Sequence, residues 1–185
     1  MYHIKNDKRA RASTELICAG LWACMKEKPF ARITITDVQR ASTVSRSTFY
    51  RNFDCLEDAL ALLCDRGFQA VFSEYNALPP ERRGSLAKAV FQYWFRNSAV
   101  LEALVQIHRT DILFDSLRRS SGLIQAPQPM VDDPARFDYF VAIITSSMIG
   151  VLTVWVEHGK TETEDQMVQK LTSAFIEMAI LELPG

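Results

Sequence analysis

The chain has 185 residues, of which 48% are hydrophobic and 23% charged, so a disordered or fibrous protein is excluded and a packed globular core is expected. Its formal net charge of −1 is unevenly distributed: residues 1–53 carry ten Lys and Arg against four Asp and Glu, and the remainder carries eleven against eighteen. A basic head (residues 1–53) on an acidic body (residues 54–185) is typical of a DNA-binding region joined to a region that does not bind DNA.

The first twelve residues are basic and lack the apolar stretch of a signal peptide. They contain Lys5, Lys8, Arg9 and Arg11. We predict a flexible basic arm in which Arg9 and Arg11 reach along DNA phosphates or into a minor groove. A solvated charge run without function is the alternative.

Residues 13–28 predict an amphipathic helix, because apolar side chains recur there every three or four positions. Pro29 ends this helix, and we expect Phe30 and Ile33 to pack the following turn against its apolar face. The apolar positions are Leu16, Ile17, Leu21, Trp22 and Met25.

Two short helices joined by a tight turn are predicted over residues 33–53. Thr34 followed by Asp37 fits a capping box at the start of the first helix, in which each residue satisfies a backbone N–H of the other. Val38 and Ala41 give this helix a buried side.

The second short helix follows a turn at residues 42–44 and is predicted from Arg46 to Phe53, with Ser45 as its N-cap. Phe49 and Phe53 lie four positions apart, so both can face inward and leave a polar outer side. Arginine can bind guanine or phosphate, and hydroxyl groups can bind bases or phosphates. We therefore predict a helix-turn-helix whose DNA-binding residues are Ser45, Arg46, Ser47, Thr48, Tyr50 and Arg51 in a major groove, with Thr34 and Thr36 at phosphates.

This stretch resembles the signature of the tetracycline-repressor (TetR) family of transcriptional regulators, and the likeness covers about the first third of the chain, from Thr14 to Leu63. The resemblance implies an all-α homodimer with a three-helix N-terminal head that binds DNA. It also implies a helical body that binds a small molecule, and repression as the default action. The residues that carry it are Phe30, Ile33, Thr34, Asp37, Val38, Ala41, Val44, Ser45, Arg46, Ser47, Thr48, Phe49, Tyr50, Phe53 and Glu57.

Three positions depart from the family pattern. Gln39 stands where a small residue usually packs between the two short helices. Thr43 stands where the turn usually has glycine, so a positive φ there would be strained. Leu56 stands where a lysine usually binds phosphate. These departures support an alternative function, a helical ligand-binding or interaction protein whose DNA binding is weakened or lost.

The body is predicted to be helical throughout, with breaks at Pro, Gly and capping residues. Asp54 and Glu57 form a capping signal for its first helix, which by the resemblance connects head and body and transmits ligand binding. Asp133 before Pro134 marks the start of a long helix, and Thr161 or Thr163 caps the last one. The predicted helices cover about residues 54–75, 85–94, 98–108, 110–120, 134–158 and 163–181, with loops at 76–84 and 121–133.

One stretch of eighteen residues, Tyr139 to Val156, contains no charge and reaches the lower length limit of a membrane-spanning helix. It is interrupted by hydroxyl residues such as Thr145 and Ser146. We expect it to be a helix buried in a bundle or a dimer, in a cytoplasmic protein without membrane contact.

The last two helices are predicted to form a homodimer interface, because a four-helix bundle made from two such pairs would bury their apolar stripes. Closing the monomer's own core is the alternative role. A two-fold dimer suits a palindromic double-stranded DNA operator, since paired heads meet half-sites in successive major grooves. The predicted interface residues are Ile149, Leu152, Trp155, Val168, Leu171, Phe175 and Met178.

An effector pocket is predicted inside the body, where aromatic walls and one or two polar groups can enclose a small molecule of unknown identity. Each candidate residue has the alternative of being ordinary core. The candidates are Phe91, Trp94, His108, Phe114, Tyr139 and Ile143.

The four cysteines, Cys18, Cys24, Cys55 and Cys64, lack metal-site spacing, so we expect free thiols and predict neither a metal nor a cofactor. No sequence motif for nucleophilic, metal-dependent or phosphate-binding catalysis is present, so an enzyme is not expected. The sequence therefore predicts a DNA-binding transcriptional regulator, by default a repressor, whose operator binding is controlled by an effector.

Overall fold

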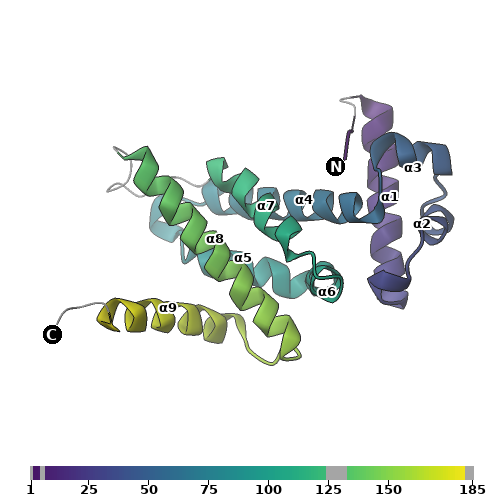
Figure 1. Cartoon of the computed structure of the whole chain (residues 1–185). Coiled ribbons are helices and arrows are strands. Elements are labelled where there is room, and N and C mark those ends of the chain that lie inside the picture. Colours follow the sequence, from purple (N-terminus) through teal and green to yellow (C-terminus); the bar gives the residue numbers. More distant parts are fainter. Residues whose placement is uncertain (1, 5–6, 124–132, 182–185) are drawn as a thin grey trace.

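The computed structural model describes residues 2–4, 7–123 and 133–181, and within these ranges it contains nine α-helices, three 3-10 helices and no strand (Figure 1). The predicted all-α fold is confirmed. Most of the loop predicted at residues 121–133 lies outside the described residues, which there include only the short 3-10 helix η3 (Ser121–Leu123) and Asp133.

The head contains three helices that pack together at one end of the molecule (Figure 1). The first begins earlier than predicted, because the Asp7 carboxylate accepts a hydrogen bond from the Ala10 N–H at 2.7 Å and caps it. The prediction of a flexible arm is therefore wrong for residues 8–12, and Arg9 and Arg11 lie on a helix. The elements of the head are α1 (Lys8–Glu27), η1 (Phe30–Arg32), α2 (Ile35–Ser42) and α3 (Arg46–Asn52).

α1 and α2 approach closely at Gly20. A Cβ atom at this position would lie 2.8 Å from the Ser42 Cβ and 3.1 Å from the Val38 carbonyl oxygen. Ser42 is only 4% exposed. The prediction that Ala41 faces the interior is wrong: Ala41 is exposed, and Ser42 occupies the space against α1. The missing side chain at Gly20 thus sets the separation of the two helices.

The described part of the body contains six further α-helices. Three of these helices are capped by a side-chain oxygen that accepts a backbone N–H hydrogen bond, from Ser85, Asp133 and Thr163. The caps predicted at Ser85 and Asp133 are confirmed. Of the two caps predicted for the last helix, Thr163 is the one that forms. The elements of the body are α4 (Leu56–Ala77), η2 (Pro80–Arg82), α5 (Leu86–Arg96), α6 (Ser98–Gln106), α7 (Thr110–Ser120), η3, α8 (Pro134–Glu157) and α9 (Glu164–Leu181).

The start of α4 differs from the prediction. Cys55 is its N-cap and makes no side-chain capping hydrogen bond. The Asp54 N–H instead donates to the Asp58 carboxylate at 2.9 Å, so Asp58 takes the place that the sequence suggested for Glu57.

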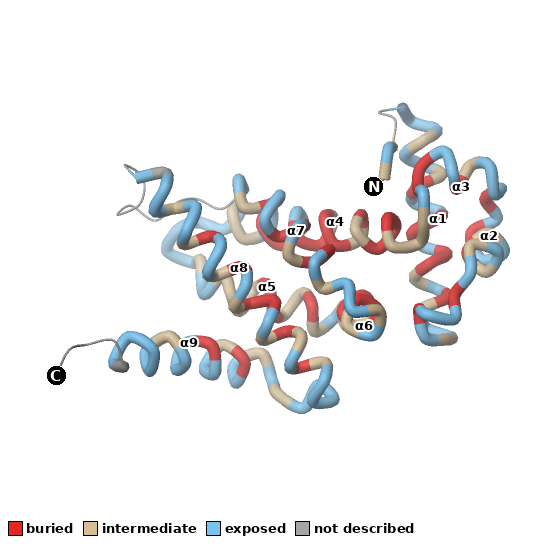
Figure 2. The backbone as a smooth tube through the Cα atoms, viewed as in Figure 1, coloured by how far each residue is buried: buried red, intermediate tan, exposed pale blue. Residues whose placement is uncertain are grey.

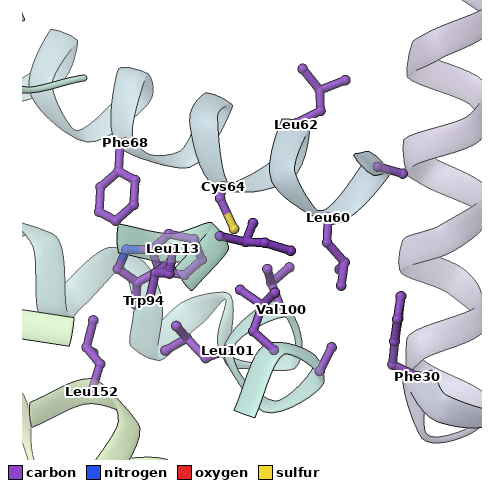
Figure 3. Close-up of a cluster of buried hydrophobic side chains, with 14 of the residues drawn as sticks. Phe30, Leu60, Leu62, Cys64, Phe68, Trp94, Val100, Leu101, Leu113 and Leu152 are labelled. Carbon is purple, nitrogen blue, oxygen red and sulfur yellow. The ribbon is translucent and has the colours of Figure 1, made fainter. Parts of the chain in front are cut away.

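α4 is the central helix of the body and carries a long buried face (Figure 2). It packs against α5, α6 and α7, and also against α1 of the head. Figure 3 shows Phe68 of α4, Trp94 of α5, Leu113 of α7 and Leu152 of α8 in one cluster. The Phe68 and Trp94 ring centroids are 5.2 Å apart. The Trp94 Nε1–H in this cluster has no hydrogen-bond partner in the part of the chain that is described.

α8 has one buried and one exposed face. Met148 and Trp155 are buried in the body, whereas Tyr139 and Ile143 are 73% and 54% exposed. By length and composition alone, residues 135–157 could cross a membrane. α8 packs against α6 and α7 as a bundle helix, but only 33% of its most apolar 18-residue window is buried, so the predicted burial holds for one face of the helix in the monomer.

The contact at Gly20 gives a stability prediction. Gly20→Ala should lower the free energy of unfolding by about 1–3 kcal/mol, because the added methyl group overlaps Ser42 across a helix contact that has no room for it. Gly84→Ala is the matched control, since no atom lies within 4 Å of its added methyl group. Denaturant unfolding followed by circular dichroism measures both, and equal stability of the two variants would contradict a fixed α1–α2 separation.

Candidate nucleic-acid interface

The start of α2 is held by a complete capping box. The Thr34 hydroxyl accepts from the Asp37 N–H at 3.2 Å, and the Asp37 carboxylate accepts from the Thr34 N–H at 2.8 Å. Lys28 Nζ lies 2.7 Å from the same carboxylate. The bonds from Lys28, and then from Thr34, hold the pKa of Asp37 well below its usual range. α2 is therefore fixed to the end of α1 as well as to its own N-cap.

A tight turn at Thr43 connects α2 to α3. Thr43 has φ 57° and ψ 14°, the left-handed conformation that the sequence anticipated and that glycine adopts with less strain. The Ser42 hydroxyl accepts from the Val44 N–H at 3.3 Å, and Val44 is buried. The turn is thus formed with threonine in place of glycine.

α3 is anchored through aromatic side chains. Phe49 and Phe53 are 1% and 0% exposed, and their ring centroids are 5.6 Å apart. At its start, the Ser45 hydroxyl accepts from the Thr48 N–H at 3.3 Å, which confirms Ser45 as the N-cap. Because one side of this short helix is buried, its polar residues other than Thr48 and Asn52 are turned outward.

The outer side of α3 carries the predicted DNA-binding residues. Arg46, Ser47, Tyr50 and Arg51 are exposed, and Thr48 is half-buried. Arg46 Nη2 donates to the Tyr50 hydroxyl at 3.4 Å, and its guanidinium carbon lies 5.6 Å from the centre of the Tyr50 ring. This pair was not predicted, although its spacing of four residues on a helix was the available signal.

Two arginines from separate helices meet beside α3. Arg9 on α1 and Arg51 on α3 line one hollow of about 290 Å³, together with the polar side chains of Ser13, Thr48 and Asn52 and with Asp7, whose carboxylate caps α1. In the described part of the chain, Arg9 and Arg51 have no carboxylate partner. Two unpaired guanidinium groups beside hydroxyl groups can bind a phosphate. Arg11 is exposed on α1 and does not line this hollow.

Thr34 and Thr36 are exposed at the start of α2. Their hydroxyls and the basic hollow lie on elements that pack around α1 in the head. The structure therefore distributes the predicted base-contacting residues along α3 and the predicted phosphate-contacting residues over the starts of α1 and α2.

The residues predicted for an effector pocket are not brought together. Phe91 and Trp94 are 0% and 1% exposed in the body core, whereas Tyr139 and Ile143 are exposed on α8. Phe114 is half-buried on α7, and His108 is exposed at the turn before it. None of them lines the hollow beside α3 or the two body cavities that follow.

A cavity of about 520 Å³ lies instead between the second half of α4 and α5. Its walls include the rings of Tyr75 and Tyr93, and burial raises the pKa of Tyr93. Glu74 and Arg96 also line it, and neither has an ion-pair partner in the described part of the chain. Tyr93 touches Trp94, with ring centroids 5.2 Å apart.

The residues predicted for the dimer interface fall into two groups. Ile149, Leu152 and Trp155 are buried within the monomer, and the Trp155 ring stacks on Phe95 with centroids 3.9 Å apart. On α9, Leu171 is 8% exposed, Val168 and Phe175 are half-buried, and Met178 is 58% exposed. A mostly apolar groove of about 420 Å³ separates α8 from α9, and its lining includes Trp155, Leu171, Phe175 and Met178.

Comparison with known proteins places this arrangement in a recognised fold. No protein-family model and no curated protein matches the sequence. Among solved structures, the chain is similar to the crystal structure of a TetR transcriptional regulator from Streptococcus agalactiae 2603V, with a TM-score of 0.55. The match covers 91% of this chain and 96% of that chain at 19% sequence identity. The chain therefore has the TetR-like fold that its helix-turn-helix sequence indicated, over the body as well as the head.

The depressed pKa of Asp37 predicts a pH dependence of stability. The folded state binds the Asp37 proton less readily than the unfolded state, so the ionised carboxylate stabilises the fold above its usual pKa of about 4. This contribution is lost as the pH falls from there through the depressed value. Asp37→Asn should therefore lower the free energy of unfolding at pH 7, and the difference from the wild type should shrink in acid.

Asp115→Asn is the control for this measurement, because Asp115 is an exposed carboxylate on α7. Urea unfolding at a series of pH values measures all three proteins. A difference between Asp37→Asn and the wild type that stays constant down to strongly acidic pH would show that the carboxylate charge is not what stabilises α2.

Proposed function

We propose that the protein is a homodimeric DNA-binding transcriptional regulator that uses α3 as its recognition helix, with repression as its default action. The observation that carries the proposal is the two-sidedness of α3. Its aromatic residues Phe49 and Phe53 are buried, and an exposed row of hydroxyl and guanidinium groups lies opposite them. An exposed helix of this composition suits a major groove, where arginine and hydroxyl groups can hydrogen-bond base edges.

Phosphate contacts would orient this helix. Arg9 from α1 lies beside Arg51 in one hollow, and Thr34 and Thr36 are exposed at the start of α2. Such contacts fix the position of a protein on the duplex and supply most of its salt-dependent affinity. The concentration of positive charge in the first 53 residues supports the same assignment.

A dimer would place two recognition helices on one operator. The apolar groove between α8 and α9 is open in the monomer, and Met178, Ile176 and Ile180 of α9 are more than half exposed. We propose that α8 and α9 of a second copy cover these surfaces in a four-helix arrangement. A two-fold axis there would set the distance between the heads, and hence the spacing of the half-sites.

We further propose that a small effector binds in the cavity between α4 and α5. Its volume of about 520 Å³ falls in the range of small-molecule sites. It combines phenol rings with a carboxylate and a guanidinium that have no ion-pair partner among the described residues. α4 runs without interruption from the head to this cavity. A ligand that binds one position of α4 better than another would shift the separation of the heads, whereas equal affinity would shift nothing.

The recognition helix is tested with DNA selected from random sequences by the wild-type protein. Tyr50→Ala and Arg51→Ala should each weaken binding to this DNA by about 1–3 kcal/mol and relax its sequence preference. Arg82→Ala, which removes an exposed arginine of η2 beyond the C-terminal end of α4, should leave the affinity unchanged. Unchanged binding by both α3 variants would refute the assignment, and sequence-blind binding by the wild type would favour the alternative of a helical interaction protein with lost DNA specificity.

The dimer is tested at Phe175, which lines the groove and is half-buried in the monomer. Phe175→Glu should yield monomers on a sizing column with light scattering, because a carboxylate would be buried without a partner in the dimer. Ser73→Glu introduces the same charge at an exposed position of α4, outside the proposed interface of α8 and α9, and it should leave the dimer intact. A dimer that survives Phe175→Glu with unchanged affinity would remove this groove from the interface.

A further inference from the structure

We propose that Tyr2, His3 and Ile4, which we call the N-terminal strap, clamp the recognition helix α3 to the body and so fix its orientation relative to α4 and α7. The strap has one anchor in the head and one in the body, on adjacent residues. Any effect of the strap on operator binding rests on the proposed function. The clamping of α3 by the strap does not depend on that function.

The head anchor is the end of α3. The His3 N–H donates to the Asn52 carbonyl oxygen at 3.0 Å. Asn52 is 2% exposed, and its side-chain amide donates to the Thr48 carbonyl oxygen at 2.8 Å. The Thr14 hydroxyl of α1 lies 3.5 Å from the Asn52 side-chain oxygen. The strap therefore binds a residue that is itself fixed to both α3 and α1.

The body anchor is a buried carboxylate of α4. The Tyr2 hydroxyl donates to Asp65 Oδ2, and Arg119 Nη2 of α7 donates to Asp65 Oδ1 at 2.8 Å. Asp65 is 5% exposed. A carboxylate this deeply buried is costly unless its oxygens accept hydrogen bonds. The Tyr2 hydroxyl supplies one of the hydrogen bonds that stabilise the buried Asp65 carboxylate. Burial and then the Asp65 hydrogen bond raise the pKa of Tyr2 to about 12.

The two anchors are close enough in sequence to act as one mechanical link. One residue of extended chain spans only about 3.3–3.6 Å, so the backbone between Tyr2 and His3 has little slack. Because the Tyr2 hydroxyl is at the tip of its side chain, small displacements of α4 or α7 can be followed by side-chain rotation, and larger ones move the end of α3 or release one anchor. This link runs beside the covalent connection at Asp54 and Cys55, through which α3 passes into α4, since His3 Nδ1 lies 3.9 Å from the Asp54 carboxylate.

A second contact, an ion pair between α4 and α1, also joins the head to the body. Arg66 of α4 forms a bidentate pair with Glu15 of α1, with distances of 2.7 and 3.1 Å. Arg66 follows Asp65 directly, so neighbouring residues of α4 bind α1 and the strap. The strap adds what this pair lacks, a contact with the recognition helix itself.

The test uses Tyr2→Phe, which removes only the hydroxyl of a partly exposed residue and leaves Asp65 paired with Arg119. Tyr75→Phe is the matched control, because it also removes one phenol hydrogen bond, to the Gly84 carbonyl oxygen at 2.9 Å, near the opposite end of α4. Amide hydrogen exchange by NMR reports on the anchors without DNA, so the result does not depend on whether the protein binds an operator.

Tyr2→Phe should accelerate exchange of the His3 amide by roughly tenfold or more, the change expected for loss of one hydrogen bond to a charged group. Amides of α3 that bond within the head, such as Phe53 to the Phe49 carbonyl oxygen, should also exchange faster, while those of α9 should not change. Tyr75→Phe should match the wild type at both sites. Unchanged His3 exchange in Tyr2→Phe would overturn the body anchor, and faster His3 exchange with unchanged α3 exchange would overturn the clamp on the recognition helix.

Discussion

The burial of Phe49 and Phe53 beneath α1 is the constraint on which the functional interpretation depends. α3 is too short to be stable alone, since isolated helices of fewer than about 12 residues are marginal in water. It exists because its aromatic side is packed in the head core. Because the packing fixes the rotation of α3 about its own axis, the opposite side of the helix faces outward and carries Arg46, Tyr50 and Arg51. The same contacts that stabilise the head therefore present the groups that would contact DNA.

The head is joined to the body by several contacts in addition to the chain itself. Phe30 of η1 is buried at the end of the cluster that continues along α4 (Figure 3), and η1 packs against α6. Arg66 pairs with Glu15, and Tyr2 bonds to Asp65. A movement of the body helices therefore reaches the head at more than one point. These contacts support the proposal that the body controls the head.

Local chemistry made the helix-turn-helix predictable. The capping box at Thr34, the N-cap at Ser45 and the inward pair Phe49 and Phe53 all depend on neighbours within a few positions, and all were found as the sequence indicated. The strained turn at Thr43 was also anticipated. Ala41 was misplaced because helical spacing alone cannot tell which of two adjacent residues meets a glycine of another helix.

Features that depend on distant parts of the chain were less predictable. Nothing near Tyr2 in sequence indicates that its hydroxyl would meet Asp65, and a basic N-terminus equally suggests a free arm. The pocket residues were chosen for aromatic character, but packing in three dimensions buries Trp94 and exposes Tyr139. The cavity between α4 and α5 combines Glu74 and Tyr75 of one helix with Tyr93 and Arg96 of another, and no local sequence pattern indicated that these residues would meet. Tertiary packing determines which of these residues are buried and which meet, because it brings together helix faces that are far apart along the chain.

The most direct test of DNA recognition by a paired α3 is a footprint of the wild-type protein on sequences selected from random DNA. Protection should appear as two related half-sites with centres about 10–10.5 base pairs, or a multiple of this, apart. Affinity for the selected DNA should fall steeply as salt is raised, and should exceed that for a shuffled sequence at every salt concentration. Uniform weak protection, with equal affinity for selected and shuffled DNA, would contradict the account.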